Sequence, residues 1–430
     1  MTRIPMTTAP SATGLAAYAS LRLPLALLEL PLFVLLPSLY GQSLGLELAV
    51  VGAVLFAARL VDALADPLIG ASVDGARHRF TPLHWIRASL PVLALGFWAM
   101  VAPPRGASDV QLAVWLAATS IVTYLAYSAA TVAYQSWGAQ IGVGERERAR
   151  VTGTREAFGL VGVVAAAALL TPERAPALAL AFALLAAIAA LLLRWAPSGV
   201  ERRPAATSWR RRWSTVFENR AFRWLLAAFV LNGIATAIPA TLLLFFVRDV
   251  LRAEAQVPLF LVSYFLAGAA GMPLWIALAG RVGLRNAWLL GMAFAVMAFA
   301  ATLGLGAGDV AAFWVVCVLT GLALGADLAM PPALLASVIA AHGDGGRHEG
   351  AYFGVWNLAT KLNLAAAAGL GLPLLALTGY RPGSGADTTL ALALAYAALP
   401  GALKLAAGAV LLLSPAPAPA PQREPEEGSP

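Results

Sequence analysis

Apolar runs of roughly 20 residues recur along most of this 430-residue chain, and they limit its fold more than any other feature. An α-helix needs about 20 apolar residues to cross the hydrocarbon core of a bilayer. The runs are continuous rather than alternating, which argues against a transmembrane β-barrel. Hydrophobic residues make up 60% of the chain and charged residues 12%, whereas soluble domains are about half apolar and a quarter charged. We therefore expect an all-α polytopic membrane protein, not a soluble enzyme.

The runs divide into twelve predicted transmembrane helices in two groups of six. The longest internal polar segment, SGVERRPAATSWRRRWSTVFENR at 198–220, separates the two groups. We expect an N-terminal half at 1–197, a cytoplasmic linker at 198–220, a C-terminal half at 221–413 and a disordered Pro/Ala-rich cytoplasmic tail at 414–430. The expected helices are 15–40, 47–70, 83–103, 109–140, 148–171, 175–197, 221–247, 256–280, 285–306, 310–340, 350–378 and 388–413.

Arginines are distributed unevenly between the two sets of loops and predict the orientation. Fourteen lie on the side that includes the linker, and five lie on the opposite side. By the positive-inside rule, the richer side and both termini are cytoplasmic. The same loops account for the net charge of +7, so no nucleic-acid partner is expected. The polar start at 1–13 predicts no cleavable signal peptide, and the arginine- and alanine-rich composition is typical of a GC-rich bacterium, hence an inner-membrane protein.

The stretch RLVDALADPLIG at 59–70 places three charges inside an apolar run. Arg59, Asp62 and Asp66 are spaced i, i+3 and i+7, so they share one helical stripe. A charge at mid-helix costs about 2.5–3.5 kcal/mol on insertion, so these side chains should face a cavity or a partner. Their net charge of −1 would be neutralised by one Na⁺ or one proton. The alternative is a static network in which Arg59 bridges both aspartates. Pro67 predicts a kink or a helix end.

Two six-helix halves with matching short basic loops at 70–79 and 271–285 resemble the major facilitator superfamily. In that fold the substrate site lies near the bilayer midplane between the halves. The longer stretch RLVDALADPLIGASVDGARHR at 59–79 resembles the signature of the glycoside–pentoside–hexuronide:cation symporters, the melibiose permease-like family. The resemblance implies that Asp62 and Asp66 bind the coupling cation, with Arg59 as a charge-coupling residue.

The segment TVAYQSWGAQIGVGERERARVTGTREAFGLVG at 131–162 extends this resemblance to helix 4 and the following loop. A helix-4 aspartate of the family aligns with Thr131, whose hydroxyl can ligate Na⁺ but carries no charge. Arg155 roughly matches a family arginine that faces the substrate cavity. The alternative for Arg155 is an arginine at the cytoplasmic rim of its helix.

Lys361 lies inside the predicted helix at 350–378, and Lys404 is the only other lysine in the chain. A lysine at the same motif position of the family lies near the cation site. The resemblance therefore implies a charge-coupling role, and we expect Lys361 to approach Asp62 or Asp66 from the other half. The alternative is a lysine that snorkels to the membrane surface.

Further polar residues are weaker candidates. Glu29 has Arg22 seven residues earlier on the same helical face, so the two either pair or face the cavity. Asp327 stays without an assigned role, as a gate or a packing residue. Residues that could line a solute site, each of which could equally be a packing residue, are Glu29, Tyr127, Tyr134, Gln135, Arg155, Asn232, Trp356, Asn357 and Asn363. Asp74, Arg77, Glu147 and Arg148 are expected to pair between cytoplasmic loops as a gate, although a solvated basic surface explains each one as well.

Together these features predict a cation-coupled (Na⁺ or H⁺) secondary transporter, a sugar or glycoside symporter that works by alternating access. No phosphate-binding GxxxxGK[ST] motif occurs, so the coupling ion replaces ATP and no cofactor is expected. The expected partners are a small-molecule solute and membrane lipid, with no obligate protein partner. One alternative is an exporter or carrier of a lipid-like or drug-like solute. A membrane-embedded receptor or enzyme is the other, but the four histidines lack metal-ligand spacing, and Cys317, the single cysteine, precludes an internal disulfide.

Overall fold

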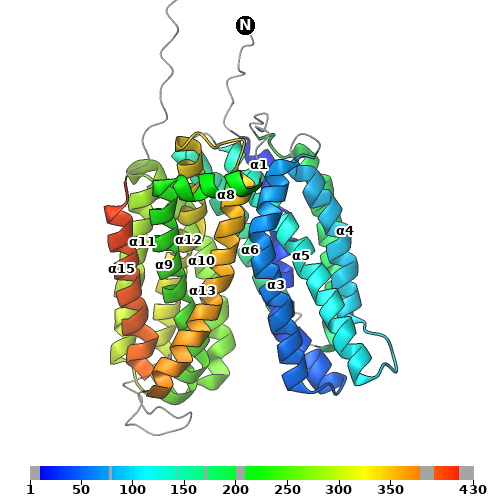
Figure 1. The fold of residues 1–430 in the computed structure, drawn as a ribbon. Coiled ribbons are helices and arrows are strands. Elements are labelled where there is room, and N and C mark those ends of the chain that lie inside the picture. The colour runs from blue at the N-terminus through cyan, green and yellow to red at the C-terminus, as the bar shows by residue number, and fades with distance from the viewer. Residues whose placement is uncertain are drawn as a thin grey trace, which may run out of the picture.

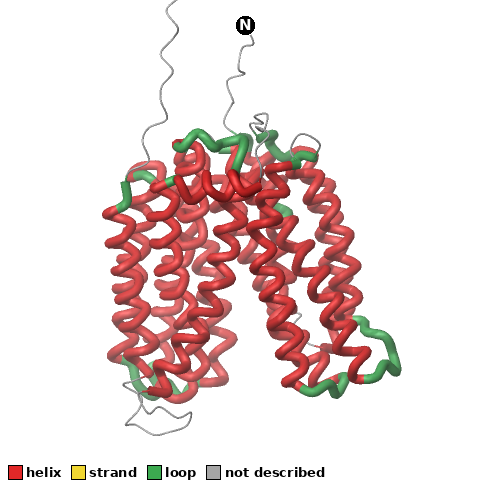
Figure 2. Tube along the Cα trace, in the orientation of Figure 1, coloured by secondary structure: helices red, strands yellow, loops and turns green. Residues whose placement is uncertain are grey.

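The computed structural model describes residues 10–76, 80–142, 144–168, 172–199, 209–377 and 392–415. Figure 1 shows two groups of helices that meet at one end and splay apart at the other. We call the meeting end the α8 end, because the short helix α8 (Trp209–Glu218) lies across it, and the other the open end. The described part of the chain forms helices and loops, as Figure 2 shows.

The N-terminal half begins with a first span made of several pieces. These are α1 (Ala12–Ala19), α2 (Arg22–Leu30), η1 (Pro31–Leu35) and η2 (Ser38–Ser43), of which the last two are wound as π-helix. The other spans of this half are α3 (Leu48–Gly75), α4 (Pro82–Val101), α5 (Asp109–Ile141), α6 (Glu145–Ala168) and α7 (Ala175–Leu192).

The C-terminal half contains the remaining spans. They are α9 (Arg220–Phe245), which continues into η5 (Phe246–Val250), α10 (Val257–Val282), α11 (Leu284–Ala300), α12 (Val310–Ala341), α13 (Glu349–Leu377), and η9 (Leu394–Ala398), which runs into α15 (Leu399–Leu413). Counted within the described ranges, the two halves hold twelve spans, as the sequence predicts.

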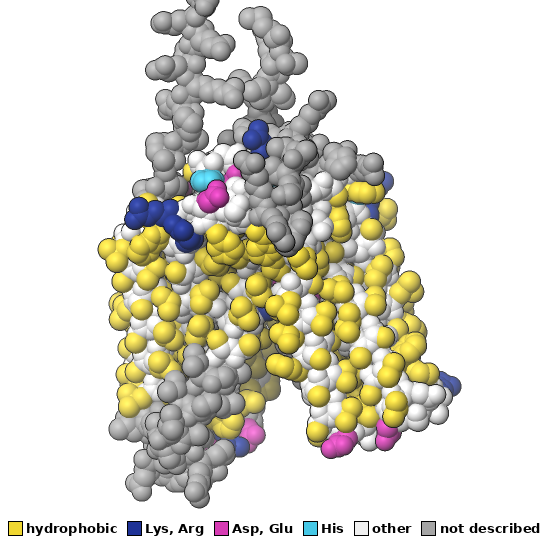
Figure 3. Space-filling view, in the orientation of Figure 1, with side chains coloured by type: hydrophobic (Ala, Val, Ile, Leu, Met, Phe, Trp, Pro, Cys, Tyr) yellow, Lys and Arg dark blue, Asp and Glu magenta, His cyan; other side chains and the backbone are white. Residues whose placement is uncertain are grey.

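The outside of the bundle is apolar. Within the described ranges, nine helices are long and apolar enough to cross a membrane. Large apolar side chains such as Phe56, Leu95 and Val110 are at least 70% exposed. Figure 3 shows hydrophobic side chains covering the length of the helices, with charged groups near the two ends. A soluble protein rarely exposes so continuous an apolar surface, so this surface is the one that contacts lipid.

Two expectations about helix ends are wrong. The single helix expected at 15–40 is broken into pieces, because Pro24, Pro31 and Pro37 lack the N–H that an α-helix needs at those positions. The helix expected to end at Gly70 continues through Pro67 to Gly75. Transmembrane helices tolerate proline when neighbouring groups satisfy the freed backbone atoms. Asp74 therefore lies in the last turn of α3 rather than in a loop.

Each half has its own apolar core, and the halves meet mainly along α3 with α13 and α6 with α10. Glycines allow α3 and α13 to come close. A Cβ on Gly70 would collide with the backbone oxygen of Gly350, and a Cβ on Gly354 would lie 2.6 Å from the Asp66 backbone oxygen. This close approach brings the middle of α13 against the charged stretch of α3.

Candidate functional site

A charged cluster joins the two halves at the centre of the bundle. Lys361, on α13, places its Nζ 2.7 Å from Asp62 Oδ2 and 2.7 Å from Asp66 Oδ2, both on α3. The two aspartate side chains are 2% and 1% exposed, and Lys361 is 23% exposed. Asp62 lies 13 residues from the end of α3, about 20 Å along its axis. The approach expected for Lys361 is thus found with both aspartates; the functional roles of the three residues stay predictions.

The hydroxyl beside these charges comes from Ser128 on α5. Its Oγ donates to Asp62 Oδ1 at 2.6 Å and accepts from Lys361 Nζ at 2.9 Å. Thr131, the residue suggested by the resemblance, buries its hydroxyl without a hydrogen-bond partner among the described residues. Ser128 precedes Thr131 by three residues and so lies on the same helical face. That spacing is the signal by which Ser128 could have been found.

Asp66 is held differently from Asp62. Within the described ranges neither Asp66 carboxylate oxygen has a hydrogen bond of normal geometry, although Lys361 lies close enough for an ion pair. Buried polar atoms nearly always have hydrogen-bond partners, and exceptions often mark functional positions. Because the Lys361 ammonium lies at Oδ2, it is the Asp66 Oδ1 atom that retains capacity to accept a further donor or a cation.

Arg59 stacks on an aromatic ring in the structure. Its guanidinium carbon lies 4.3 Å from the centre of the Tyr124 ring, a cation–π distance. With Lys361 included, the cluster contains two positive and two negative side chains. The charges of these four side chains therefore sum to zero, whereas Arg59, Asp62 and Asp66 alone sum to the predicted −1.

A second charged network lies within the N-terminal half. Arg22 pairs with Glu29 at 2.6 Å and with Glu156 at 3.3 Å, and Arg155 pairs with Glu156 at 2.7 Å. The Tyr127 hydroxyl donates to Glu29 at 2.7 Å. Arg155 is 4% exposed, so it is an interior residue and not the rim arginine that was its alternative. Glu156, which the sequence analysis missed, is the carboxylate shared by both arginines.

The C-terminal half contains a third network around the other lysine. Lys404 Nζ lies 2.6 Å from Asp327 Oδ2, and their side chains are 3% and 10% exposed. The Lys404 ammonium also donates to Asn232 Oδ1 at 2.8 Å and to Thr236 Oγ1 at 3.2 Å. Asp327 Oδ1 accepts from Asn232 and from Trp288. Asn232 is therefore part of an ion-pair network that the sequence analysis did not predict.

Several predicted solute-lining residues take part in packing. The Tyr134 hydroxyl donates to the Tyr18 backbone oxygen at 2.9 Å, and the Tyr18 hydroxyl returns the bond to Tyr134 at 3.0 Å. Trp356 stacks on Phe229 with ring centres 3.7 Å apart. Asn357 and Asn363 are buried, and Gln135 lines a small pocket that also contains Arg148 and Arg155. Solute binding by these residues stays a prediction.

One predicted gate residue, Asp74, caps a helix of the opposite half. Asp74 accepts the backbone N–H groups of Gly350 (2.9 Å) and Ala351 (2.7 Å), in the first turn of α13. Glu145, on α6, likewise accepts the N–H of Leu284 at the start of α11 (3.1 Å). A carboxylate at a helix N-terminus is favourable because the first N–H groups lack helical partners.

The remaining gate residues differ in what the structure shows of them. Arg148 donates to Ser337 Oγ at 2.9 Å, which again links the two halves. Glu147 is half-buried in the first turn of α6. Arg77 lies outside the described residues. Within the described ranges, contacts from side chains to helix termini and to a serine close the α8 end. Pairing between the cytoplasmic loops stays a prediction.

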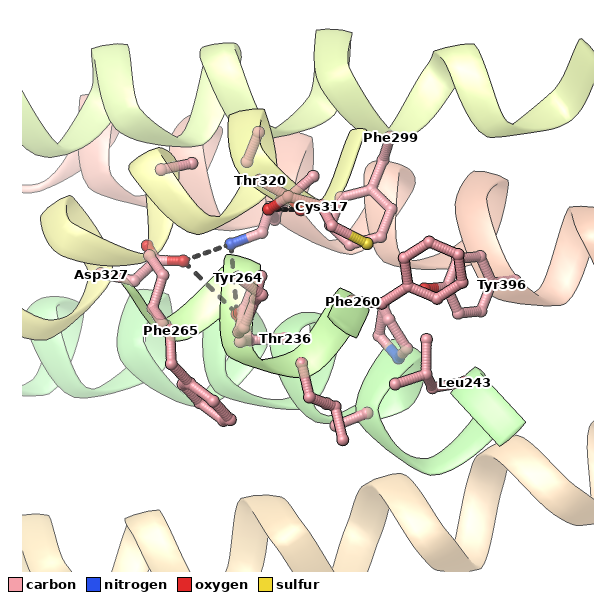
Figure 4. Close-up of a pocket in the computed structure, with 17 residues that line it drawn as sticks. Thr236, Leu243, Phe260, Tyr264, Phe265, Phe299, Cys317, Thr320, Asp327 and Tyr396 are labelled. Carbon is pink, nitrogen blue, oxygen red and sulfur yellow. Dashed lines mark hydrogen bonds and ion pairs between the residues drawn. The ribbon is translucent and has the colours of Figure 1, made fainter. Parts of the chain in front are cut away.

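One cavity, of about 140 Å³, lies inside the C-terminal half. Figure 4 shows Asp327 and Thr236 toward one end of it, and Phe260, Phe299 and Tyr396 toward the other. Its remaining lining is mostly apolar and comes from α9, α10, α11, α12 and α15. No group of three or more His, Cys, Asp or Glu side chains is placed to hold a metal ion in the part of the chain that the structure describes.

Two six-helix halves, a charged cluster where they meet and a gap that widens toward one end define a transporter of the major facilitator superfamily. The sequence pattern of the family described as MFS/sugar transport protein matches residues 17–417, and this chain belongs to that family. Its members are carriers and not enzymes, so this protein transports a small-molecule solute across a membrane. No curated protein sequence matches the chain.

Solved structures agree with this fold. A bacterial homologue of the iron transporter ferroportin, in an outward-facing state, has a TM-score of 0.71 at 17% identity, covering 93% of this chain and 98% of that one. The fucose:proton symporter of E. coli has a TM-score of 0.66 at 14% identity, covering 91% and 98%. A human organic anion transporter has a TM-score of 0.66 at 17% identity, covering 93% and 99%. At these identities the likeness concerns the fold.

Proposed function

We propose that the protein is a cation-coupled secondary transporter, driven by Na⁺ or H⁺, that carries a sugar or glycoside by alternating access. The observation that carries this proposal is the position of Lys361, whose ammonium touches both Asp62 and Asp66 from the opposite half. In this state a tethered cation contacts both buried carboxylates.

A mobile cation at the aspartates competes with Lys361. When Na⁺ binds a carboxylate or a proton neutralises it, the ion pair between α3 and α13 weakens, because Na⁺ repels the Lys361 ammonium and a protonated carboxyl no longer attracts it. Ser128 supplies a neutral oxygen suited to a hard cation. Occupancy by the ion thereby changes the energy of the contact between the halves, which is the condition for coupling an ion gradient to alternating access.

The family match and the fucose:proton symporter structure support a sugar or glycoside as solute. The N-terminal half offers the hydrogen-bonding groups of Arg22, Glu29, Tyr127 and Glu156. We place the α8 end at the cytoplasm of a bacterial inner membrane, since the arginine-rich loops lie there.

A second candidate is a carrier of a lipid-like or drug-like solute, which is favoured by the mostly apolar lining of the C-terminal cavity. The two candidates share the coupling site and differ only in the solute.

Uptake into proteoliposomes tests the proposal. A panel of radiolabelled sugars, alkyl and aryl glycosides and apolar organic anions is offered under an imposed Na⁺ gradient, an imposed pH gradient or neither. We expect one gradient to drive accumulation, Asp62→Asn to abolish it, and Asp109→Asn, which changes an exposed acid at the start of α5, to leave it intact. Gradient-driven uptake that persists in Asp62→Asn would rule out the assigned coupling site.

A further inference from the structure

The cavity in the C-terminal half has an aromatic end and a polar end. Figure 4 shows Phe260, Phe299, Tyr396 and Leu243 gathered on one side, away from Asp327. Tyr264 and Phe265 add two more aromatic rings to the lining. Aromatic walls of this kind favour contact with another ring, edge-on or offset.

The charges at the polar end of this cavity already have hydrogen-bond partners. The Lys404 ammonium has three donors, and the structure gives it three acceptors, on Asn232, Thr236 and Asp327. Asp327 in turn accepts from Lys404, Asn232 and Trp288. A charged group entering here would have to break this network or remain without a partner, which costs about 1–3 kcal/mol for each buried polar group. The cavity therefore selects uncharged groups, and its mostly apolar lining favours groups that are largely apolar.

The size of the cavity sets the size of such a group. An engineered apolar protein cavity of about 150 Å³ takes up benzene, and the cavity here measures about 140 Å³. A single aromatic ring, or an alkyl group of similar bulk, fills this space. The cavity is also reachable, because two of its lining residues, Ala240 and Leu261, are exposed.

We propose that this cavity binds an uncharged apolar group of about one aromatic ring, and that the transported solute bears such a group. The first claim, that the cavity binds such a group, stands on the cavity alone. The second claim, that the transported solute bears such a group, rests on the transport function proposed above. It narrows the solute to an aryl or alkyl derivative rather than a free sugar.

A direct binding measurement tests the claim that the cavity binds an apolar group. The protein in nanodiscs is titrated with 4-fluorobenzyl alcohol and followed by fluorine NMR, with empty nanodiscs to measure partition into lipid. We expect saturable binding in excess of partition. Ala240→Trp fills the cavity from its exposed side and should reduce affinity at least tenfold. Ala227→Trp is an equally exposed position on α9 that does not line the cavity, and it should bind as the wild type does. Equal binding by both variants, or none by the wild type, would overturn the site.

A second readout needs no variant, so it is independent of folding defects. An aryl diazirine photolysed with the wild-type protein should label peptides that contain Phe260, Tyr264 or Tyr396, and excess 4-fluorobenzyl alcohol should suppress the labelling. Labelling confined to other helices would contradict the proposal.

Competition between solutes and 4-fluorobenzyl alcohol tests the claim about the solute separately from the proposed transport function. A solute that is transported should displace 4-fluorobenzyl alcohol from the cavity. In the wild type, uptake of an aryl glycoside should exceed uptake of the methyl glycoside of the same sugar at least tenfold. In Ala240→Trp this preference should be lost. Transport of a solute that does not compete with 4-fluorobenzyl alcohol would overturn only the claim about the solute. A lipid acyl chain found in the cavity by native mass spectrometry and released by the arene would do the same. Uptake independent of any cation gradient, with arene binding intact, would overturn the coupling proposal and leave the cavity site standing.

Discussion

The Asp62 carboxylate contacts one hydroxyl and one ammonium, and the hydroxyl belongs to Ser128 rather than to Thr131. We predict that Ser128→Ala raises the cation concentration for half-maximal uptake about tenfold or more, because a hydrogen bond to a charged group contributes about 1.5–3 kcal/mol. Thr131→Ala is the matched control and should change this concentration less than threefold. Cation titration of uptake in proteoliposomes measures both. A larger effect of Thr131→Ala would return the helix-4 oxygen to the position suggested by the resemblance.

Lys404 and Asp327 form a buried ion pair that neither the spacing of the residues nor the family resemblance predicts. We predict that Lys404→Met or Asp327→Leu alone destabilises the protein by about 3–5 kcal/mol, since each leaves an uncompensated buried charge. The double variant should recover most of this loss. Thermal unfolding in detergent, followed by light scattering, measures the three variants. A double variant as unstable as the sum of the singles would show that the pair does not act as a unit.

The residues of the central cluster differ in how far the sequence could identify them. Asp62 and Asp66 were identifiable because charges spaced along one stripe of an apolar helix must face the interior. Lys361 was identifiable because it is one of two lysines and lies inside a span. Ser128 was missed because a serine in an apolar helix is common and carries no charge. The partner of Lys404 was hidden because Asp327 lies 77 residues away on another helix.

The pair α3 and α13 is the element on which closure of the α8 end depends. Gly354 packs against the Asp66 backbone, and a Cβ there would lie 2.6 Å from its oxygen. We predict that Gly354→Ala reduces the population of the state seen here, because α13 must move away from α3. Gly52→Ala is the control: Gly52 lies on α3, the helix that Gly354 contacts, but a Cβ at Gly52 meets nothing within 4 Å.

Distances between two spin labels, measured by electron paramagnetic resonance, report the population of this state. Labels at Leu48 and Leu259, which are 62% and 49% exposed near the open ends of α3 and α10, measure the separation of the two halves in a Cys317→Ala background. We expect Gly354→Ala to shift the distribution toward shorter distances and Gly52→Ala to leave it unchanged. Identical distributions for both variants would mean that the glycine contact does not control the opening.

The helix boundaries could be predicted only in part from the sequence. Apolar length predicted the spans well, because lipid exposure demands it. It did not predict that Pro24, Pro31 and Pro37 would divide the first span, nor that Pro67 would leave α3 continuous, since the outcome depends on neighbouring helices. Helix α8, within the predicted linker, has Val216 buried against the bundle, a contact that the basic sequence around it conceals.

At the scale of the whole molecule, three kinds of contact between the two halves stand out among the described residues. Asp74 and Glu145 cap helix N-termini of the opposite half, glycines bring α3 and α13 together, and Lys361 bridges to Asp62 and Asp66. The first two close the α8 end. The third lies deeper and involves charges that a cation can neutralise, so we assign to it the response to the ion gradient.

The caps at the α8 end yield a further prediction. Asp74→Asn keeps the size of the side chain but removes the charge that favours the first turn of α13. We expect it to lower the population of the open-end-open state in the same spin-distance measurement, and Asp109→Asn to leave that population unchanged. No difference between the two variants would show that the cap on α13 contributes nothing to closure.

The central claim is that a cation bound at Asp62 and Asp66 displaces Lys361 and changes how the halves are arranged. Titrating Na⁺, and separately pH, while recording the distance between the Leu48 and Leu259 labels tests it without knowledge of the solute. The account predicts a saturable shift in the distance distribution with one of the two ions, and no shift when Asp62→Asn and Asp66→Asn are combined. The same shift in the protein with and without the two carboxylates would contradict it.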